Sequence, residues 1–208
     1  LGGVLLGFAG SGGDALQQHW PQAALALLLA LLCHAAVNVI NDVADHDNGS
    51  DAANVARQFP FTGGSRVIQD ALLSRRDMAR LAQGLFVLVI GGGLLLVWLS
   101  GPWLLAIGVI GVVLGWGYSA PPLRLNSRGL GEGCVLLCFT LLPLGAQVLL
   151  SGTPSLSMLA AALPYGLLAS ALLYINQFPD RDADALAGKR HWVVRLVPQQ
   201  ARYGYPLL

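Results

Sequence analysis

Charge is scarce in this sequence, and its long apolar segments contain none at all. Asp, Glu, Lys and Arg make up 11% of the 208 residues, whereas a soluble domain normally carries about a quarter. Cysteine is also rare. Cys33, Cys134 and Cys138 lie within or beside apolar segments, so we expect packing residues and no disulfide framework. Apolar residues reach 55%, and this balance excludes an ordinary soluble domain.

Long apolar segments recur along the chain. The five segments lie at about 22–40, 81–99, 103–119, 134–150 and 157–175. Each is long enough to cross the ~30 Å hydrocarbon layer of a bilayer as a helix, and a buried core would explain one such segment but not five. We therefore expect an all-α, polytopic transmembrane helix bundle with the lipid bilayer as its partner and no nucleic acid. Residues 1–208 form one domain in this interpretation, truncated at both ends.

The connections between the apolar segments alternate in character. Short, almost uncharged connections fall at 11–21, 100–102 and 151–156. Longer, polar connections fall at 41–80, 120–132 and 177–208, and they hold all twelve Lys and Arg residues. The positive-inside rule assigns the polar set to the cytoplasm. We expect an integral protein of a bacterial inner membrane with its active site on the cytoplasmic face.

Two of these polar connections begin with the same arrangement of amides and carboxylates. In each, an asparagine is followed by two aspartates at helical spacing: Asn38, Asp42 and Asp45 in the first, and Asn176, Asp180 and Asp184 in the second. Spacings of three and four place side chains on one face of a helix. Because Mg²⁺ takes oxygen ligands, usually carboxylates together with substrate phosphates, the four aspartates predict a magnesium diphosphate site. A solvated acidic loop would explain one cluster, but two matching clusters on one side favour a site.

Candidate phosphate ligands lie near both clusters. The loop 61–66 (F-T-G-G-S-R) combines glycines, hydroxyls and Arg66, which suits phosphate oxygens. Lys189 follows the second cluster, and His191 beside it is a weaker candidate for a base. Tyr118, just before the polar connection 120–132, and Arg124 within it either anchor the membrane interface or line the site.

Ordered motifs along the chain resemble the UbiA superfamily of intramembrane prenyltransferases. The family's N-D-x-x-D and D-x-x-x-D patterns correspond to 41–45 and 180–184. The flanking segments 63–74, 118–125 and 187–196 resemble the 1,4-dihydroxy-2-naphthoate polyprenyltransferase branch. The chain departs from the pattern at Gly49, where the longer first motif has a third acid, and at Ala71, where the branch often has glycine.

The resemblance implies a nine-helix fold, of which this chain covers five spans and part of another. It also implies Mg²⁺-dependent transfer of a polyprenyl group from its diphosphate to a small aromatic acceptor, here 1,4-dihydroxy-2-naphthoate in menaquinone biosynthesis. The implied metal ligands are Asp42, Asp45, Asp180 and Asp184, supported by Asn38, Asn41 and Asn176. The implied phosphate ligands are Arg66, Lys189 and Arg124, and Tyr118 orients the acceptor or shields the carbocation.

The sequence is compatible with three alternatives. The same chemistry serves other acceptors, such as 4-hydroxybenzoate or a chlorophyll or haem precursor. CDP-alcohol phosphotransferases also use acidic helix motifs, but they carry them in one continuous segment, unlike the two separate clusters found here. A transporter would be expected to bind its substrate near the bilayer midplane, yet the five apolar segments contain no Asp, Glu, Lys or Arg.

Overall fold

The computed structural model describes residues 1–55, 57–58 and 62–207, and every regular element within them is helical. In chain order the elements are α1 (Gly2–Ser11), α2 (Gly13–Gln18), α3 (Trp20–Asn48), α4 (Ser50–Ala53), α5 (Arg75–Ser100), α6 (Trp103–Ser119), η1 (Leu125–Arg128), α7 (Gly131–Ser151), α8 (Leu156–Leu186), α9 (Trp192–Arg195), α10 (Pro198–Ala201) and η2 (Tyr205–Leu207). The predicted all-α helix bundle is confirmed.

Each predicted apolar segment lies inside one of the five long helices. α3, α5, α7 and α8 are long and apolar enough to cross a membrane, whereas α6, at 17 residues, is shorter. α3 and α8 run well past the predicted spans, to 29 and 31 residues. The acidic segments therefore continue these two helices instead of forming loops.

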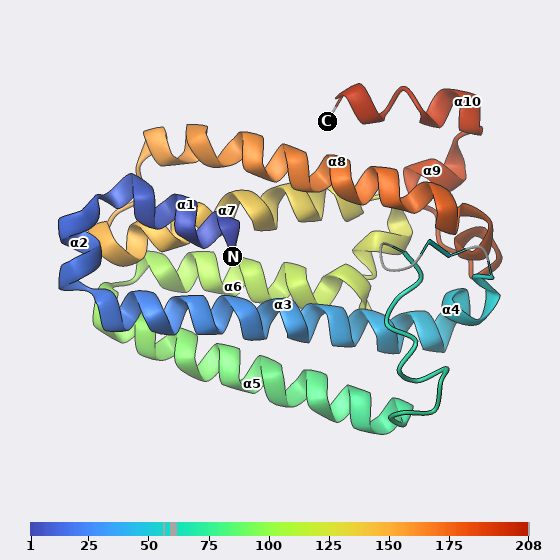
Figure 1. The fold of residues 1–208 in the computed structure, drawn as a ribbon, viewed down its shortest axis with the longest axis horizontal. Helices are drawn as coiled ribbons and strands as arrows, with labels where there is room; N and C mark the ends of the chain where they lie inside the picture. Colours follow the sequence, from blue (N-terminus) through green and yellow to red (C-terminus); the bar gives the residue numbers. More distant parts are fainter. Residues whose placement is uncertain (56, 59–61, 208) are drawn as a thin grey trace.

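The long helices pack side by side as a bundle, with α3 against α5 and α7 against α8 (Figure 1). α6 contacts α3, α5 and α7, and α1 packs on α7. The α7–α8 contact depends on Gly166, where an added Cβ would lie 2.3 Å from Thr140 Oγ1 and 2.6 Å from the Leu136 carbonyl oxygen. Small residues allow such close approach between membrane helices.

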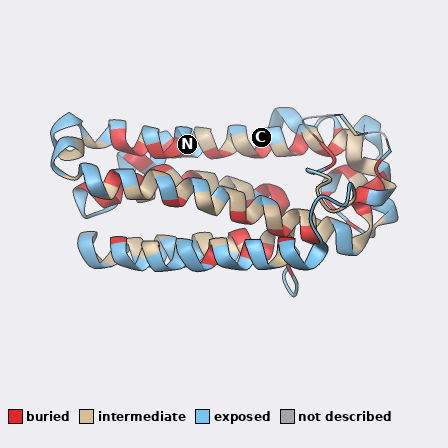
Figure 2. Cartoon of the chain, turned by 60° about the horizontal axis from the view of Figure 1, so that its bottom comes forward, coloured by how far each residue is buried: buried red, intermediate tan, exposed pale blue. Residues whose placement is uncertain are grey.

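The outward faces of the long helices are exposed (Figure 2), and many of the exposed side chains are large and apolar. Trp98, Leu168 and Val87 are 80%, 70% and 69% exposed. Large contiguous apolar surfaces are unusual on soluble monomers but are ordinary against lipid chains. The chain is an integral membrane protein.

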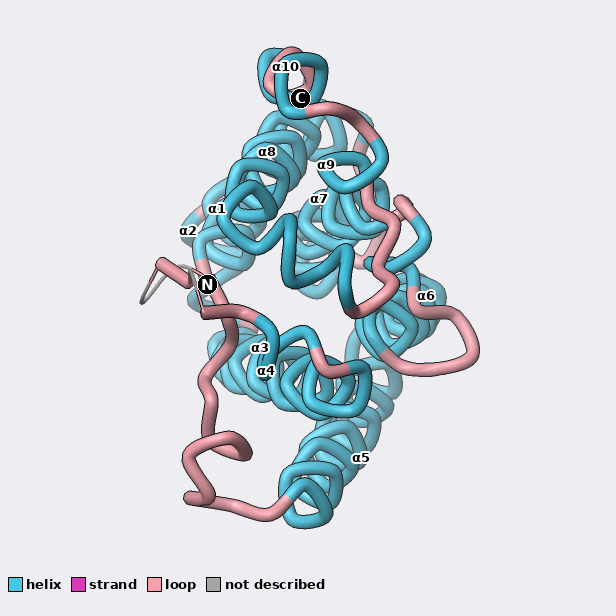
Figure 3. The backbone as a smooth tube through the Cα atoms, turned by 90° about the vertical axis from the view of Figure 1, so that its right-hand side faces the viewer, coloured by secondary structure: helices cyan, strands magenta, loops and turns pink. Residues whose placement is uncertain are grey.

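The polar connections gather at one end of the bundle, which Figure 3 views end-on. There α3 ends and α4 follows it, while α8 ends near α9 (Figure 1). α5 begins at the same end, where Ser74 Oγ accepts a 3.1 Å hydrogen bond from the Asp77 amide and so caps the helix. The two acidic helix ends are thus brought to the same end of the molecule.

Candidate active site

A cavity of about 230 Å³ lies where the ends of α3 and α8 approach each other. Its lining comes from these helix ends, from α4 and α6, and from the connections around them: Asn41, Asp45, Ser50, Asp51, Asn54, Thr62, Gly63, Gly64, Tyr118, Asn126, Leu173, Asn176, Gln177, Asp180, Asp184, Lys189 and His191. The lining is predominantly polar. Among the described residues in it, Lys189 is the one lysine or arginine, against four aspartates.

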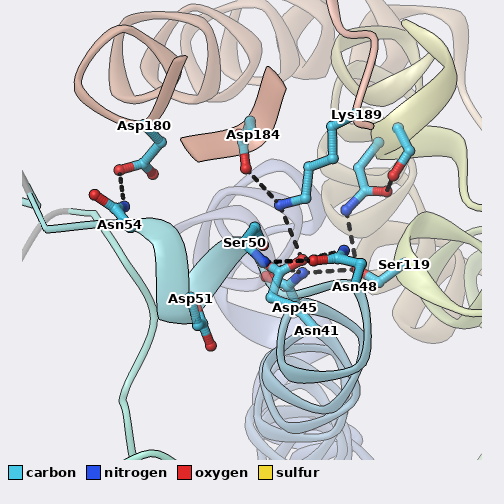
Figure 4. A network of polar contacts seen from close by, with 12 residues as sticks. Asn41, Asp45, Asn48, Ser50, Asp51, Asn54, Ser119, Asp180, Asp184 and Lys189 are labelled. Carbon is cyan, nitrogen blue, oxygen red and sulfur yellow. Dashed lines mark hydrogen bonds and ion pairs between the residues drawn. The ribbon is translucent and has the colours of Figure 1, made fainter. Parts of the chain in front are cut away.

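The Lys189 ammonium bridges the two acidic helix ends (Figure 4). Its Nζ lies 2.9 Å from Oδ1 of Asp45 on α3 and 2.9 Å from Oδ1 of Asp184 on α8. Burial lowers the pKa of Lys189, but the charges of Asp45 and Asp184 outweigh it, so that the pKa lies above its ordinary value. The ammonium is therefore charged across the physiological range.

Backbone geometry after α8 brings Lys189 and His191 back over the helix end. Gly188 has a φ of 77°, which glycine adopts without strain, and the Lys189 amide then donates a 2.9 Å hydrogen bond to the Asp184 carbonyl. His191 is 2% exposed, with Nε2 lying 3.0 Å from Asp184 Oδ2. Both carboxylate oxygens of Asp184 thus have a partner from this one short segment.

The face of α3 that meets the cavity contains Asn41 and Asp45, whereas the predicted face paired Asn38 with Asp42 and Asp45. Asn41 Nδ2 donates to Asp45 Oδ2 at 3.3 Å and to Ser119 Oγ on α6 at 2.9 Å. Asn48 Nδ2 donates to Asp45 Oδ1 at 3.2 Å, so 41, 45 and 48 form one polar stripe. Asn38, which the sequence paired with Asp42, is exposed and lies outside the cavity lining.

Asp51 lines the cavity, and Asp42, a predicted metal ligand, lies beside it but outside the lining. A Cβ at Gly64 would lie 3.1 Å from Asp42 Oδ1 and 3.2 Å from Asp51 Oδ1, so both carboxylates face this glycine. Asp42 accepts hydrogen bonds from the hydroxyl and amide of Ser65. Gln69 Nε2 donates to Asp51 Oδ2 at 3.0 Å. Burial, reinforced by the charges of Asp45 and Asp42, raises the pKa of Asp51 to about 7.

Asp180 is held by Asn54, the residue that follows α4. Asn54 Nδ2 donates a 2.6 Å hydrogen bond to Asp180 Oδ1. Asn176, one turn earlier on α8, also lines the cavity. The face predicted from the spacing of Asn176, Asp180 and Asp184 is therefore the face that meets the cavity, while the roles of these residues stay predictions.

The predicted arginines lie away from the cavity lining. Arg66 Nη1 donates to the Asp51 carbonyl at 3.1 Å, and its Nε lies 4.0 Å from Asp70. Arg124 is exposed. Tyr118, in contrast, lines the cavity as expected. Phe61, at the start of the predicted phosphate loop, lies outside the described residues.

The chemistry of the donor set fits a hard divalent cation, although the predicted ligands do not surround one point. Among the described residues, no group of three or more His, Cys, Asp or Glu side chains is placed to hold a metal. Asp45 and Asp184 instead each place a carboxylate oxygen against the Lys189 ammonium. Carboxylate oxygens are also what Mg²⁺ prefers, so the Lys189 ammonium marks a position that suits a cation.

Several residues of the site carry little or no signal in the sequence. Asn54 belongs to none of the motifs, and although Ser119 lies within 118–125, its spacing does not show that it meets α3. Asn54 bonds Asp180 and Ser119 bonds Asn41 only because the fold brings them there. The sequence alone favours His191 only as a weak candidate for a base, whereas in the structure it is a buried partner of Asp184. For His191, the sequence signal is the motif A-G-K-R-H, because it follows the second acidic cluster directly.

The family model described as "UbiA prenyltransferase family" matches residues 3–208. A 1,4-dihydroxy-2-naphthoate octaprenyltransferase of Mycobacterium tuberculosis is 31% identical over 89% of this chain and 62% of its own length. A 2-carboxy-1,4-naphthoquinone phytyltransferase of Synechocystis is 29% identical over 93% of this chain and 60% of its own length. The bacteriochlorophyll synthase 33 kDa chain of Cereibacter sphaeroides is 38% identical, over 50% of this chain and 35% of its own length.

The chain spans about 60% of the length of the two naphthoate-type relatives. No solved structure gives a significant match to it.

Proposed function

The chain belongs to the UbiA prenyltransferase family, and from that premise we propose that it transfers a polyprenyl group from its diphosphate to 1,4-dihydroxy-2-naphthoate, as in menaquinone biosynthesis. The relatives that match most of its length carry names of this type. Their names support a naphthalene-type acceptor and an isoprenoid donor.

The observation that carries the proposal is that Asp45 and Asp184, from the ends of two different helices, both contact the Lys189 ammonium. The described lining holds four aspartates and one lysine, so a diphosphate would be repelled unless further positive charge entered with it. A magnesium ion bound here would supply that charge and, as a Lewis acid, stabilise the leaving diphosphate. Asp45 and Asp184, with Asp180 and Asp42 nearby, are the residues we propose to hold it.

The remaining polar groups of the cavity orient the carboxylates. Asn41 bonds Asp45, Asn54 bonds Asp180, and His191 bonds Asp184. Hydrogen bonds of this kind fix the direction of a ligand side chain and raise metal affinity. We assign these three residues positioning roles.

Tyr118 and Leu173 supply the less polar part of the lining. We propose that the Tyr118 ring lies against the reacting end of the prenyl chain, where an aromatic face stabilises positive charge, and that it orients the acceptor. The prenyl tail is then expected to run along the apolar bundle, where exposed leucine side chains face the lipid.

We also propose that the cavity faces the cytoplasm of a bacterial cell. The polar connections that surround it carry all twelve Lys and Arg residues of the chain. The positive-inside rule favours this orientation. Accessibility of a cysteine introduced at exposed Asp182 to a membrane-impermeant thiol reagent, compared in intact cells and in inverted vesicles, tests the orientation.

Prenyl transfer is tested directly in membranes that contain the protein, Mg²⁺ and a radiolabelled polyprenyl diphosphate. We expect a prenylated product with 1,4-dihydroxy-2-naphthoate, and less with 4-hydroxybenzoate or a bacteriochlorophyllide. Asp184→Asn and Asp45→Asn should abolish it, whereas Asp14→Asn, an exposed aspartate on α2, serves as the matched control. Product with another acceptor alone would overturn the acceptor assignment, and full activity in Asp184→Asn would overturn the site.

A further inference from the structure

The position between Asp45 and Asp184 is already taken by a positive charge of the chain itself. The Lys189 Nζ lies 2.9 Å from Oδ1 of each carboxylate. The three side chains are only 9–15% exposed, so solvent screens their charges weakly. Any other cation that used these two oxygens would have to displace or repel the ammonium.

The other contacts of the pair indicate which group can move. Asp184 Oδ2 is occupied by His191, whose side chain is 3% exposed. Asp45 Oδ2 receives the Asn41 amide, which also bonds Ser119. Lys189, in contrast, carries its charge on a flexible four-carbon stem. Its backbone amide stays fixed on the Asp184 carbonyl at 2.9 Å, so the side chain can swing while the loop remains in place.

A diphosphate offers the ammonium a new set of oxygens in the same cavity. Charge-assisted bonds to phosphate oxygens are strong, and Lys189 lines this cavity together with the four aspartates. Movement of the ammonium from carboxylates to diphosphate would leave the two Oδ1 atoms to a divalent cation. Each ligand then favours the arrangement that the other needs.

We propose that Lys189 competes with the divalent cation for Asp45 and Asp184, and that a diphosphate relieves this competition by giving the ammonium other oxygen partners. This inference rests on the proposed function and adds a coupling between its two ligands. The cation and the diphosphate bind strongly together, and each binds weakly without the other. Because coupling between two ligands is reciprocal, the diphosphate must also bind more tightly when the cation is present.

The experiment measures the affinity of the purified protein for Mn²⁺ alone, from the electron paramagnetic resonance signal of free Mn²⁺. Lys189→Met removes the competing charge and should bind Mn²⁺ about tenfold more tightly than wild type. The repulsion between two unit charges about 4 Å apart exceeds the free energy of a tenfold change in affinity, even at an effective dielectric constant of about 20. Lys189→Gln should behave in the same way, and Lys189→Arg should stay near wild type. Arg190→Met is the matched control, because it removes an exposed neighbouring charge and should change the affinity less than twofold.

The sign of the effect separates this role from a structural one. If Lys189 served only to hold α3 and α8 together, its loss would loosen the site and weaken Mn²⁺ binding. An unchanged or weaker affinity in both Lys189→Met and Lys189→Gln therefore overturns the proposal.

A second measurement separates this proposal from the function on which it rests. Binding of a radiolabelled, non-hydrolysable polyprenyl thiolodiphosphate is measured with and without Mg²⁺. We expect Mg²⁺ to tighten binding to wild type at least tenfold and to Lys189→Met by much less. Tight, Mg²⁺-dependent binding to wild type without an affinity gain for Mn²⁺ in the variants would refute the competition alone. Absence of Mg²⁺-dependent binding to wild type would refute both.

Discussion

Asn54, the residue that follows α4, donates a 2.6 Å hydrogen bond to Asp180 on α8, across 126 positions of the sequence. This contact fixes one proposed metal ligand through a residue outside both acidic clusters. α4 follows α3 after a single residue, Gly49, with a φ of 85°. The bond therefore links the end of α3 to the end of α8 independently of Lys189.

Asn54→Ala should leave Asp180 without its amide donor. A hydrogen bond to a charged group contributes about 1.5–3 kcal/mol when buried, and we expect the lower part of that range because Asp180 is partly exposed. Prenyl transfer should fall about tenfold, mainly through a higher Mg²⁺ requirement. Activity titrated against Mg²⁺ checks this, and an unchanged Mg²⁺ requirement would count against a positioning role for Asn54.

Substitutions of Asn41 and Asn38 distinguish the face of α3 that meets the cavity from the face predicted from the sequence. Asn41 bonds Asp45 and Ser119, whereas Asn38 is exposed. We expect Asn41→Ala to reduce prenyl transfer at least tenfold and Asn38→Ala to reduce it less than twofold. Initial rates of both variants in the same membranes provide the measurement. The reverse order would show that the face identified from sequence is the functional one.

Asp51 should make the stability of the protein depend on pH. Its pKa is about 7 in the folded chain and about 3.9 when unfolded, so the folded state holds a proton that the unfolded state has lost. The contribution of Asp51 to the free energy of unfolding is fully present below about pH 4 and is lost as the pH rises through about 7. In EDTA, Asp51→Asn should unfold at the wild-type temperature at pH 4 and at a temperature a few degrees higher at pH 8.

Thermal unfolding in detergent at the two pH values tests the assignment for Asp51. The comparison variant is Asp70→Asn, which changes an exposed aspartate in the same connection and should show no such difference. Equal unfolding temperatures for wild type and Asp51→Asn at pH 8 would contradict the raised pKa.

Gly166 should tolerate no side chain where α7 and α8 meet. Its added Cβ would lie 2.3 Å from Thr140 Oγ1 and 2.6 Å from a backbone oxygen that cannot move aside easily. Overpacking of this kind costs about 1–3 kcal/mol. We expect Gly166→Ala to lower the unfolding temperature by several degrees, whereas Gly93→Ala on α5, where nothing lies within 4 Å, should not lower it. Similar results for both variants would show that the α7–α8 contact is looser than described.

The helices were predictable because hydropathy alone determines which segments can lie in lipid. The segments 22–40 and 157–175 were identified in this way, but their helices extend to Asn48 and Leu186. Those extensions are polar, and hydropathy carries no information about where a polar helix ends.

The site was predictable only as far as motifs reached. The spacing of Asn176, Asp180 and Asp184 predicts one shared face of α8, and these three residues line the cavity because one continuous helix fixes that geometry. On α3, spacing allowed two neighbouring faces, and tertiary packing against α6 through Ser119 selected the one with Asn41. Lys189 was expected on phosphate, yet its ammonium lies on two carboxylates that the sequence separates widely. Such a contact depends on the three-dimensional arrangement of helix ends.

The pairing of α3 with α5 and of α7 with α8 has a consequence for the surrounding lipid. Asp45 belongs to the first pair and Asp184 to the second, so a change in the tilt of one pair against the other alters the distance between the two carboxylates. Bilayers thinner or thicker than a hydrophobic segment change its tilt. We therefore expect prenyl transfer to pass through a maximum when the protein is reconstituted in phosphatidylcholines of increasing acyl length, and a flat profile would show that the two helix ends are held rigidly. In this protein the thickness of the membrane itself would then regulate the geometry of the reaction.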